Sequence, residues 1–98
     1  MAELTLIATT IAQPGRIDEV RSAMTKLVEP SRREPGCLEY VMHRSLSNPD
    51  AVVFYERWES SGHLEAHTLT EHFLECMKAI EGMTAEVVLE ELVKDDAG

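Results

Sequence analysis

Residues 37–58, CLEYVMHRSLSNPDAVVFYERW, decide the fold of this chain. The runs at 37–46 and 51–58 contain aromatic and β-branched residues in the proportion that is typical of β-strands. Between them, residues 47–50 read SNPD, and these residue types favour a tight turn. The stretch therefore predicts a β-hairpin in the middle of the chain.

Two further strands are predicted near the ends of the chain. Residues 4–12, LTLIATTIA, and residues 84–94, TAEVVLEELVK, are rich in β-branched and aliphatic residues. With the hairpin, they make four strands.

A helix is predicted between the first strand and the hairpin. Apolar residues recur there at the spacing of one helix face, namely Ile17, Val20, Met24, Leu27 and Val28. Pro30 is expected to end or kink this helix, because proline lacks the N–H that an inner turn needs. Residues 31–34, SRRE, could form a capping box for one more turn.

Two helices are predicted after the hairpin. Either serine at 60–61 can cap a short first helix that ends near His67. Thr68 or Thr70 can cap the second helix, and residues 68–71, TLTE, fit a capping box. The apolar stripe of this second helix consists of Leu69, Phe73, Cys76, Met77 and Ile80.

The order of these segments is β-α-β-β-α-β. It predicts a ferredoxin-like α+β fold, in which a four-stranded antiparallel sheet carries helices on one face. No second domain or internal repeat is visible, so residues 1–98 are expected to form a single domain with a frayed tail at 95–98.

Apolar residues occur on both faces of the predicted sheet. In the strand 51–58, one face has Val52, Phe54, Glu56 and Trp58, and the other has Ala51, Val53, Tyr55 and Arg57. Helices that cover one face leave the second apolar face without a cover. We therefore expect a homodimer through the sheet face.

The chain is strongly acidic. Eighteen acidic residues against nine basic ones give a net charge of −9. Nucleic acid and anionic membranes bind proteins through a positive face, so neither is expected as a partner. No apolar run approaches the roughly 20 residues of a membrane span, and no basic residue opens a secretory signal. A cytoplasmic location is expected, where Cys37 and Cys76 stay reduced.

His63 and His67 lie four residues apart in the segment HLEAH, a spacing that suits two ligands of a transition metal. Glu65, however, would project about 200° away around the helix, and no third ligand is marked. Two surface histidines on a short helix are the simpler interpretation, so no metal site is expected.

Glu56 is predicted to lie between the sheet and the helices, because it shares a strand face with Phe54 and Trp58. A buried carboxylate needs a partner or has a raised pKa. Two interpretations stay open: a structural pair with an arginine or a histidine, or a carboxylate that holds a catalytic histidine.

His67 is predicted near the C-terminus of the short helix, and His72 in the first turn of the next helix. The C-terminus of a helix favours a protonated imidazole at His67, whereas the N-terminus disfavours one at His72. Two groups with separated pKa values suit proton transfer, but both could equally be polar residues beside a core stripe. Trp58 is likewise either a core residue or the flat wall of an aromatic-ligand site.

No cofactor motif is recognisable. The chain has no phosphate-binding glycine pattern, no G-x-S-x-G and nothing that marks a flavin or nicotinamide site. We expect an activity without a cofactor.

Three motifs carry a family resemblance. They are Pro35-Gly36-Cys37-Leu38-x-Tyr40, Phe54-x-Glu56-x-Trp58-Glu59-Ser60 and His63-Leu64-x-x-His67-x-x-Thr70-x-His72-Phe73. In them the chain resembles the antibiotic biosynthesis monooxygenase domain family, and most of all its small bacterial quinol monooxygenases. The resemblance covers nearly the whole chain.

The resemblance implies a ferredoxin-like, dimeric α+β barrel with a pocket between sheet and helices. It also implies oxidation of a small quinol or a related enolisable aromatic by O₂ without metal, flavin or haem, in which the deprotonated substrate gives an electron to O₂. Glu56 would then orient or stabilise a histidine, His67 would be the base, and His72 a second histidine. The substrate-binding residues would be Trp58, Phe54, Phe73 and Met77.

Three other functions are weighed within this resemblance. The chain could be a ligand-binding dimer without turnover. It could isomerise a phosphorylated signalling sugar, for which Arg44 and Arg57 are the nearest basic candidates. Haem-degrading relatives have an asparagine in the first strand, which residues 4–12 lack, so haem degradation is less favoured.

Overall fold

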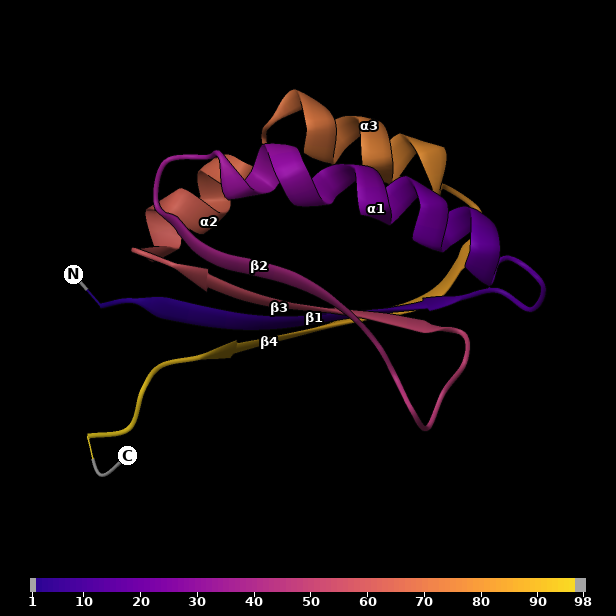
Figure 1. Ribbon diagram of the computed structural model, residues 1–98, viewed down its shortest axis with the longest axis horizontal. Coiled ribbons are helices and arrows are strands. Elements are labelled where there is room, and N and C mark those ends of the chain that lie inside the picture. The colour runs from indigo at the N-terminus through magenta and orange to yellow at the C-terminus, as the bar shows by residue number, and fades with distance from the viewer. Residues whose placement is uncertain (1, 97–98) are drawn as a thin grey trace.

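The computed structural model describes residues 2–96 as a four-stranded antiparallel sheet with its helices on one face (Figure 1). Its elements are β1 (Leu4–Ala12), α1 (Ile17–Arg32), β2 (Cys37–Arg44), β3 (Ala51–Trp58), α2 (Ser61–His67), α3 (Glu71–Ala79) and β4 (Thr84–Leu92). The strand order in the sheet is β2-β3-β1-β4. The ferredoxin-like prediction is therefore confirmed, with two consecutive helices in the second crossover.

Two strands are shorter than predicted. β2 ends at Arg44, because the backbone N–H of Asn48 already donates to Ser45 Oγ in the turn and Leu46 points fully into solvent. β4 ends at Leu92, which pairs with Thr5 at the start of β1, so residues beyond it have little strand left to pair with.

The helix α1 runs through Pro30 to Arg32. A proline in the last turn removes one backbone donor, and packing of the buried side of the helix against the sheet outweighs that loss. Ser31 is completely buried within this helix and Glu34 lies in the loop that follows. The predicted capping box at 31–34 is therefore wrong.

Side-chain caps begin the two later helices. Ser60 Oγ accepts a hydrogen bond from the backbone N–H of His63, and Thr70 Oγ1 accepts one from that of Phe73. The predicted capping box at 68–71 does not form, because Thr68 Oγ1 donates to the Glu65 carbonyl instead. Leu69, expected in the apolar stripe, lies exposed between the helices.

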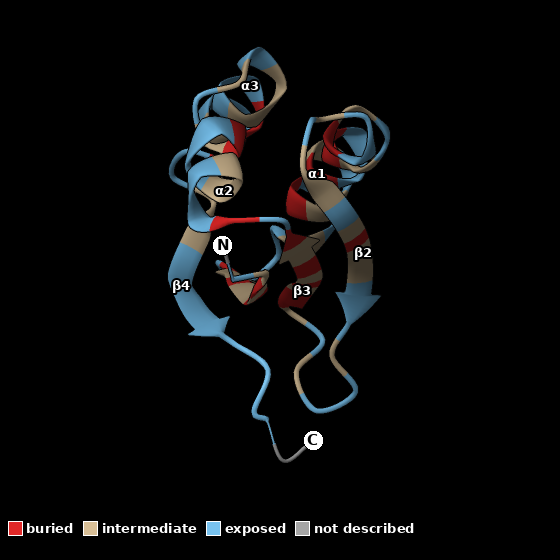
Figure 2. Ribbon diagram, turned by 90° about the vertical axis from the view of Figure 1, so that its left-hand side faces the viewer, coloured by how far each residue is buried: buried red, intermediate tan, exposed pale blue. Residues whose placement is uncertain are grey.

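Buried side chains concentrate between the helices and the inner face of the sheet. Figure 2 shows buried residues along β3, whereas β4 is exposed over nearly its whole length. The exposed residues of β4 include Val87 and Leu89 on the inner face, and Val88 and Leu92 on the outer face. Apolar residues thus occur on the outer face as predicted, and the homodimer stays a prediction.

The described residues contain no helix that is long and apolar enough to cross a membrane. The predicted frayed tail at 95–98 lies partly outside the described residues, because residues 97 and 98 are not described.

Candidate active site

Two adjoining cavities lie between the sheet and the helices. The larger measures about 320 Å³ and has walls from β1, β2, β3, β4, α1 and α3; its lining includes Met24, Tyr40, Phe54, Phe73 and Met77. The smaller measures about 140 Å³ and includes Leu6, Leu64, His67 and Thr68. Both are also lined by Ala8, Glu56, Phe73 and Leu89, so these four residues form their common boundary.

Glu56 is placed at this boundary by the alternation of β3, which points it to the same side as Phe54 and Trp58. Its side chain is buried, and Trp58 Nε1 donates a hydrogen bond to Glu56 Oε1 over 3.0 Å. Burial raises the pKa of Glu56 to about 7; the Trp58 N–H lowers it in part, and the charge of Glu34 raises it further. Near neutral pH this carboxyl group can therefore take up or release a proton.

His67 is the last residue of α2 and is only 2% exposed. Its Nδ1 lies 2.7 Å from Glu34 Oε2, and its ring is packed by the rings of Tyr40, Trp58 and Phe73. A carboxylate that accepts the Nδ1–H leaves Nε2 as the nitrogen with a free lone pair, and Nε2 makes no hydrogen bond with a described residue. Burial lowers the pKa of His67, against the opposing effect of Glu34.

Glu34 lies in the loop between α1 and β2, and Gly36 fixes that loop. Gly36 has φ +80°, and a Cβ there would clash with the His63 ring, so glycine is strongly favoured at this position. The Gly36 carbonyl also accepts from the backbone N–H of Glu59 over 2.8 Å. These contacts hold the loop against the start of α2, close to His67.

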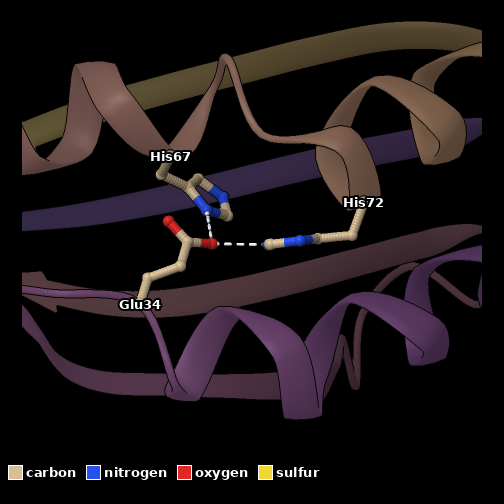
Figure 3. A group of neighbouring side chains, drawn as sticks. All are labelled: Glu34, His67 and His72. Carbon is tan, nitrogen blue, oxygen red and sulfur yellow. Dashed lines mark hydrogen bonds and ion pairs between the residues drawn. The ribbon is translucent and has the colours of Figure 1, made fainter.

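His72 completes a cluster of three side chains. It lies in the first turn of α3, and its Nε2 lies 2.6 Å from the same Glu34 Oε2 that His67 contacts. Figure 3 shows both imidazole rings pointing to this one carboxylate oxygen. His72 is partly exposed, with a side chain 25% accessible, and it lines neither cavity.

Glu34, and not Glu56, holds the histidines, which corrects the expected role of Glu56. The reason is that the Glu56 carboxylate is turned to its neighbour on the strand, the indole of Trp58. The sequence pattern did not indicate Glu34 as a site residue, because residues 31–34 fit a helix cap. The Pro35-Gly36 pair directly after it was the available signal, since a constrained loop can aim the side chain before it.

The other predicted residues divide into two groups. Phe54, Phe73 and Met77 line the larger cavity. Trp58 lies completely buried against His67 and lines neither cavity, so it occupies the core position that was one of its two interpretations.

The pair His63 and His67, weighed as metal ligands, does not converge. His63 Nδ1 lies 2.8 Å from Ser60 Oγ, whereas His67 turns toward Glu34.

Basic side chains lie away from the cavities. Arg57 is on the outer face of the sheet, where its guanidinium forms ion pairs of 2.6 Å with both Glu3 and Glu39. Arg44 is exposed at the end of β2. Among the described residues no lysine or arginine lines either cavity, so a phosphorylated sugar would meet no counter-charge there.

Comparison with known proteins gives consistent results. Residues 4–79 match the antibiotic biosynthesis monooxygenase family. YgiN of Escherichia coli K12, whose description is "probable quinol monooxygenase", is 34% identical, and the match covers 86% of this chain and 90% of YgiN. The crystal structure of PA3566 from Pseudomonas aeruginosa superposes with a TM-score of 0.90 at 35% identity, over 96% of this chain and 95% of that one. Rv0793 from Mycobacterium tuberculosis shares the fold, with a TM-score of 0.89 at 23% identity over 97% of each chain.

Proposed function

Because this chain belongs to the antibiotic biosynthesis monooxygenase family, we propose that it is a cofactor-independent monooxygenase that oxidises a small quinol with O₂. One observation carries the proposal. His67 lines a cavity inside the fold while Glu34 occupies its Nδ1, so that Nε2 is free to accept a proton.

The proposed reaction converts a quinol and O₂ into a hydroxyquinone and water. His67 Nε2 takes the proton of a substrate hydroxyl, and the resulting anion gives one electron to O₂. The superoxide and the substrate radical then combine at an unsubstituted ring carbon to form a peroxide. Loss of the hydrogen on that carbon and cleavage of the O–O bond release water and leave a carbonyl group, so both oxygen atoms are accounted for.

Glu56 is suited to the second proton transfer. A carboxyl group with a pKa of about 7 is protonated in part at neutral pH, and it lies at the boundary of both cavities. It can therefore protonate the peroxide before the O–O bond breaks. In this proposal Glu34 positions the base, and His72 supports Glu34 from the solvent side.

The lining of the larger cavity suits a flat apolar ring. Phe54 and Phe73 offer aromatic surface, and Met77 is a flexible side chain that adapts to ligand shape. An apolar lining also disfavours water beside the radical pair.

A homodimer through the outer face of the sheet belongs to the same proposal. Val88 and Leu92 lie on that face and are exposed in the single chain. A second copy would cover them.

The test is O₂ consumption with a reduced naphthoquinone in chelator-treated buffer. Quinols react slowly with O₂ unaided, so the rate must be compared with buffer alone and with a His67→Gln variant. We expect wild-type protein to accelerate O₂ uptake and hydroxyquinone formation, and the variant to fall near the background. No acceleration with several quinols would refute the proposal, and quinol binding in a calorimeter without turnover would instead indicate a ligand-binding dimer.

A further inference from the structure

We propose that Glu34, His67 and His72 form a binding site for a divalent transition-metal ion of the Zn²⁺ class, and that the bound ion switches off His67 as a base. The first half of this proposal concerns binding alone. The second half rests on the proposed function.

The donor set has the chemistry of a metal site. Two imidazole nitrogens and one carboxylate oxygen are a set that zinc uses in sites with an open fourth position. Among the described residues, the ligand atoms of Glu34, His67 and His72 all lie within 4.8 Å of one another. In a tetrahedral zinc site ligand atoms are roughly 3.3 Å apart, so the two imidazole nitrogens would have to approach each other by up to about 1.5 Å.

The Glu34 carboxylate, in contrast, must move away from both nitrogens. Its Oε2 now lies 2.7 Å from His67 Nδ1 and 2.6 Å from His72 Nε2, which is closer than ligands of one ion can be. A small rotation of the carboxylate draws Oε2 back and opens the centre of the cluster shown in Figure 3. Oε1 makes no hydrogen bond with a described residue, so this rotation breaks no further contact.

Three separate elements hold the ligands before any ion binds. His67 ends α2 and is packed by aromatic rings, and His72 begins α3. Glu34 stands on the loop that Gly36 fixes against His63. Ligands that are already ordered lose little conformational entropy on binding.

An ion can reach the cluster from solvent. His72 is partly exposed and lines a groove of about 220 Å³ between α1 and α3. The groove is also lined by Glu75, whose charge attracts a cation, and by Lys26, whose charge repels one, so the two effects offset each other. The chain as a whole has a net charge of −9, which favours the approach of a cation.

Metal binding would reverse the tautomer of His67. While Glu34 accepts the Nδ1–H, Nε2 carries the lone pair that a base needs. A metal ion on Nδ1 requires the lone pair there, so the single proton of the neutral ring must move to Nε2. Nε2 can then only donate, and the proposed proton abstraction stops.

Calorimetry with ZnCl₂ tests the site directly on untagged, chelator-treated protein. We compare wild type with Glu34→Gln and His72→Ala, and with His43→Ala as the matched control, because His43 is exposed and lies outside the cluster, with its Nδ1 3.1 Å from the Val41 carbonyl oxygen. We expect one ion per chain in wild type and in His43→Ala, and at least about 10-fold weaker binding in the two cluster variants. Equal affinity in all four proteins, or no binding by folded wild type at millimolar zinc, overturns the site.

Histidine ¹H–¹⁵N spectra test the switch without any assay of turnover. In zinc-free protein His67 Nε2 should be unprotonated, and with saturating zinc it should carry the proton. If zinc binds and Nε2 stays unprotonated, the switch is refuted. In the oxidation assay zinc should inhibit quinol oxidation, and a chelator should restore the rate. If no form of the protein oxidises a quinol, the proposed function fails, but the zinc-binding and tautomer results still stand.

Discussion

Glu34 and His67 are separated by 33 positions in the sequence, and a 2.7 Å hydrogen bond joins them in the fold. This contact fixes which nitrogen of His67 carries the proton. It therefore also fixes Nε2 as the nitrogen that can accept a proton from a substrate. Nδ1, which donates to Glu34, is the nitrogen that would bind a metal ion in the site proposed above.

Replacing Glu34 tests this contact. Glu34→Gln keeps the size of the side chain but loses the carboxylate that fixes the His67 tautomer. We expect kcat for quinol oxidation to fall about 10- to 100-fold while KM changes little, because the substrate cavity is intact. Steady-state O₂ uptake measures both constants. Glu75→Gln, a neutralised carboxylate beside His72 in the groove, is the control and should keep the wild-type kcat. An unchanged kcat in Glu34→Gln would remove Glu34 from the site.

The pH dependence of stability tests the burial of Glu56. Burial raises its pKa from the ordinary 4.5 to about 7, so the folded protein binds this proton more tightly than the unfolded chain does. Its contribution to stability is therefore complete below about pH 4.5 and is lost as the pH rises through about 7. Relative to Glu56→Gln, wild type should lose up to about 3 kcal/mol of unfolding free energy between pH 5 and pH 8. Urea unfolding followed by Trp58 fluorescence measures the difference; a difference that does not vary with pH would contradict the prediction.

Gly36 offers a matched pair with Gly15. Both have φ +80°, but a Cβ would meet the His63 ring at Gly36 and nothing within 4 Å at Gly15. Gly15→Ala should cost about 1 kcal/mol for the backbone alone. Gly36→Ala should cost about 2 to 4 kcal/mol, because the His63 ring must move as well. Chemical denaturation gives both values, and equal costs would show that the contact with His63 is not tight.

A charged substitution on the outer face of the sheet tests the expected homodimer. Val88→Glu puts a carboxylate on the exposed apolar face, where a second copy is expected to pack. We expect a wild-type dimer and a folded Val88→Glu monomer in light scattering after gel filtration. Leu69→Glu changes an equally apolar, exposed residue away from the sheet and should remain a dimer. A monomeric wild type would refute the dimer.

Local patterns were enough to predict the secondary structure and its order. The bounds of β1 and β3 are those expected from composition, and the alternation of residues along β3 was enough to predict that Glu56 lies among buried side chains. Errors arose where tertiary packing outweighed a local signal. Pro30 was expected to end or kink α1, but the helix does not end there and continues to Arg32.

The site was predicted only in part, for a physical reason. His67 and His72 stood out because they were expected at the end of one helix and the start of the next, where the helix dipole acts on a protonated imidazole in opposite ways. The partner that joins them could not be found in this way, since its contacts span 33 and 38 positions and depend on how a loop packs against α2. Trp58 and Glu56 were rightly placed on one face, but which of them lines the cavity depends on side-chain packing.

The sequence by itself determined the fold class, the family and the inner face of the sheet, because periodicity and turn chemistry act over a few residues and are written along the chain. Only the tertiary structure decided that Glu34 holds both histidines, since that contact needs the loop at Gly36 and the ends of α2 and α3 to meet in space. The proton position on His67, and with it the proposed chemistry of the site, follows from that meeting.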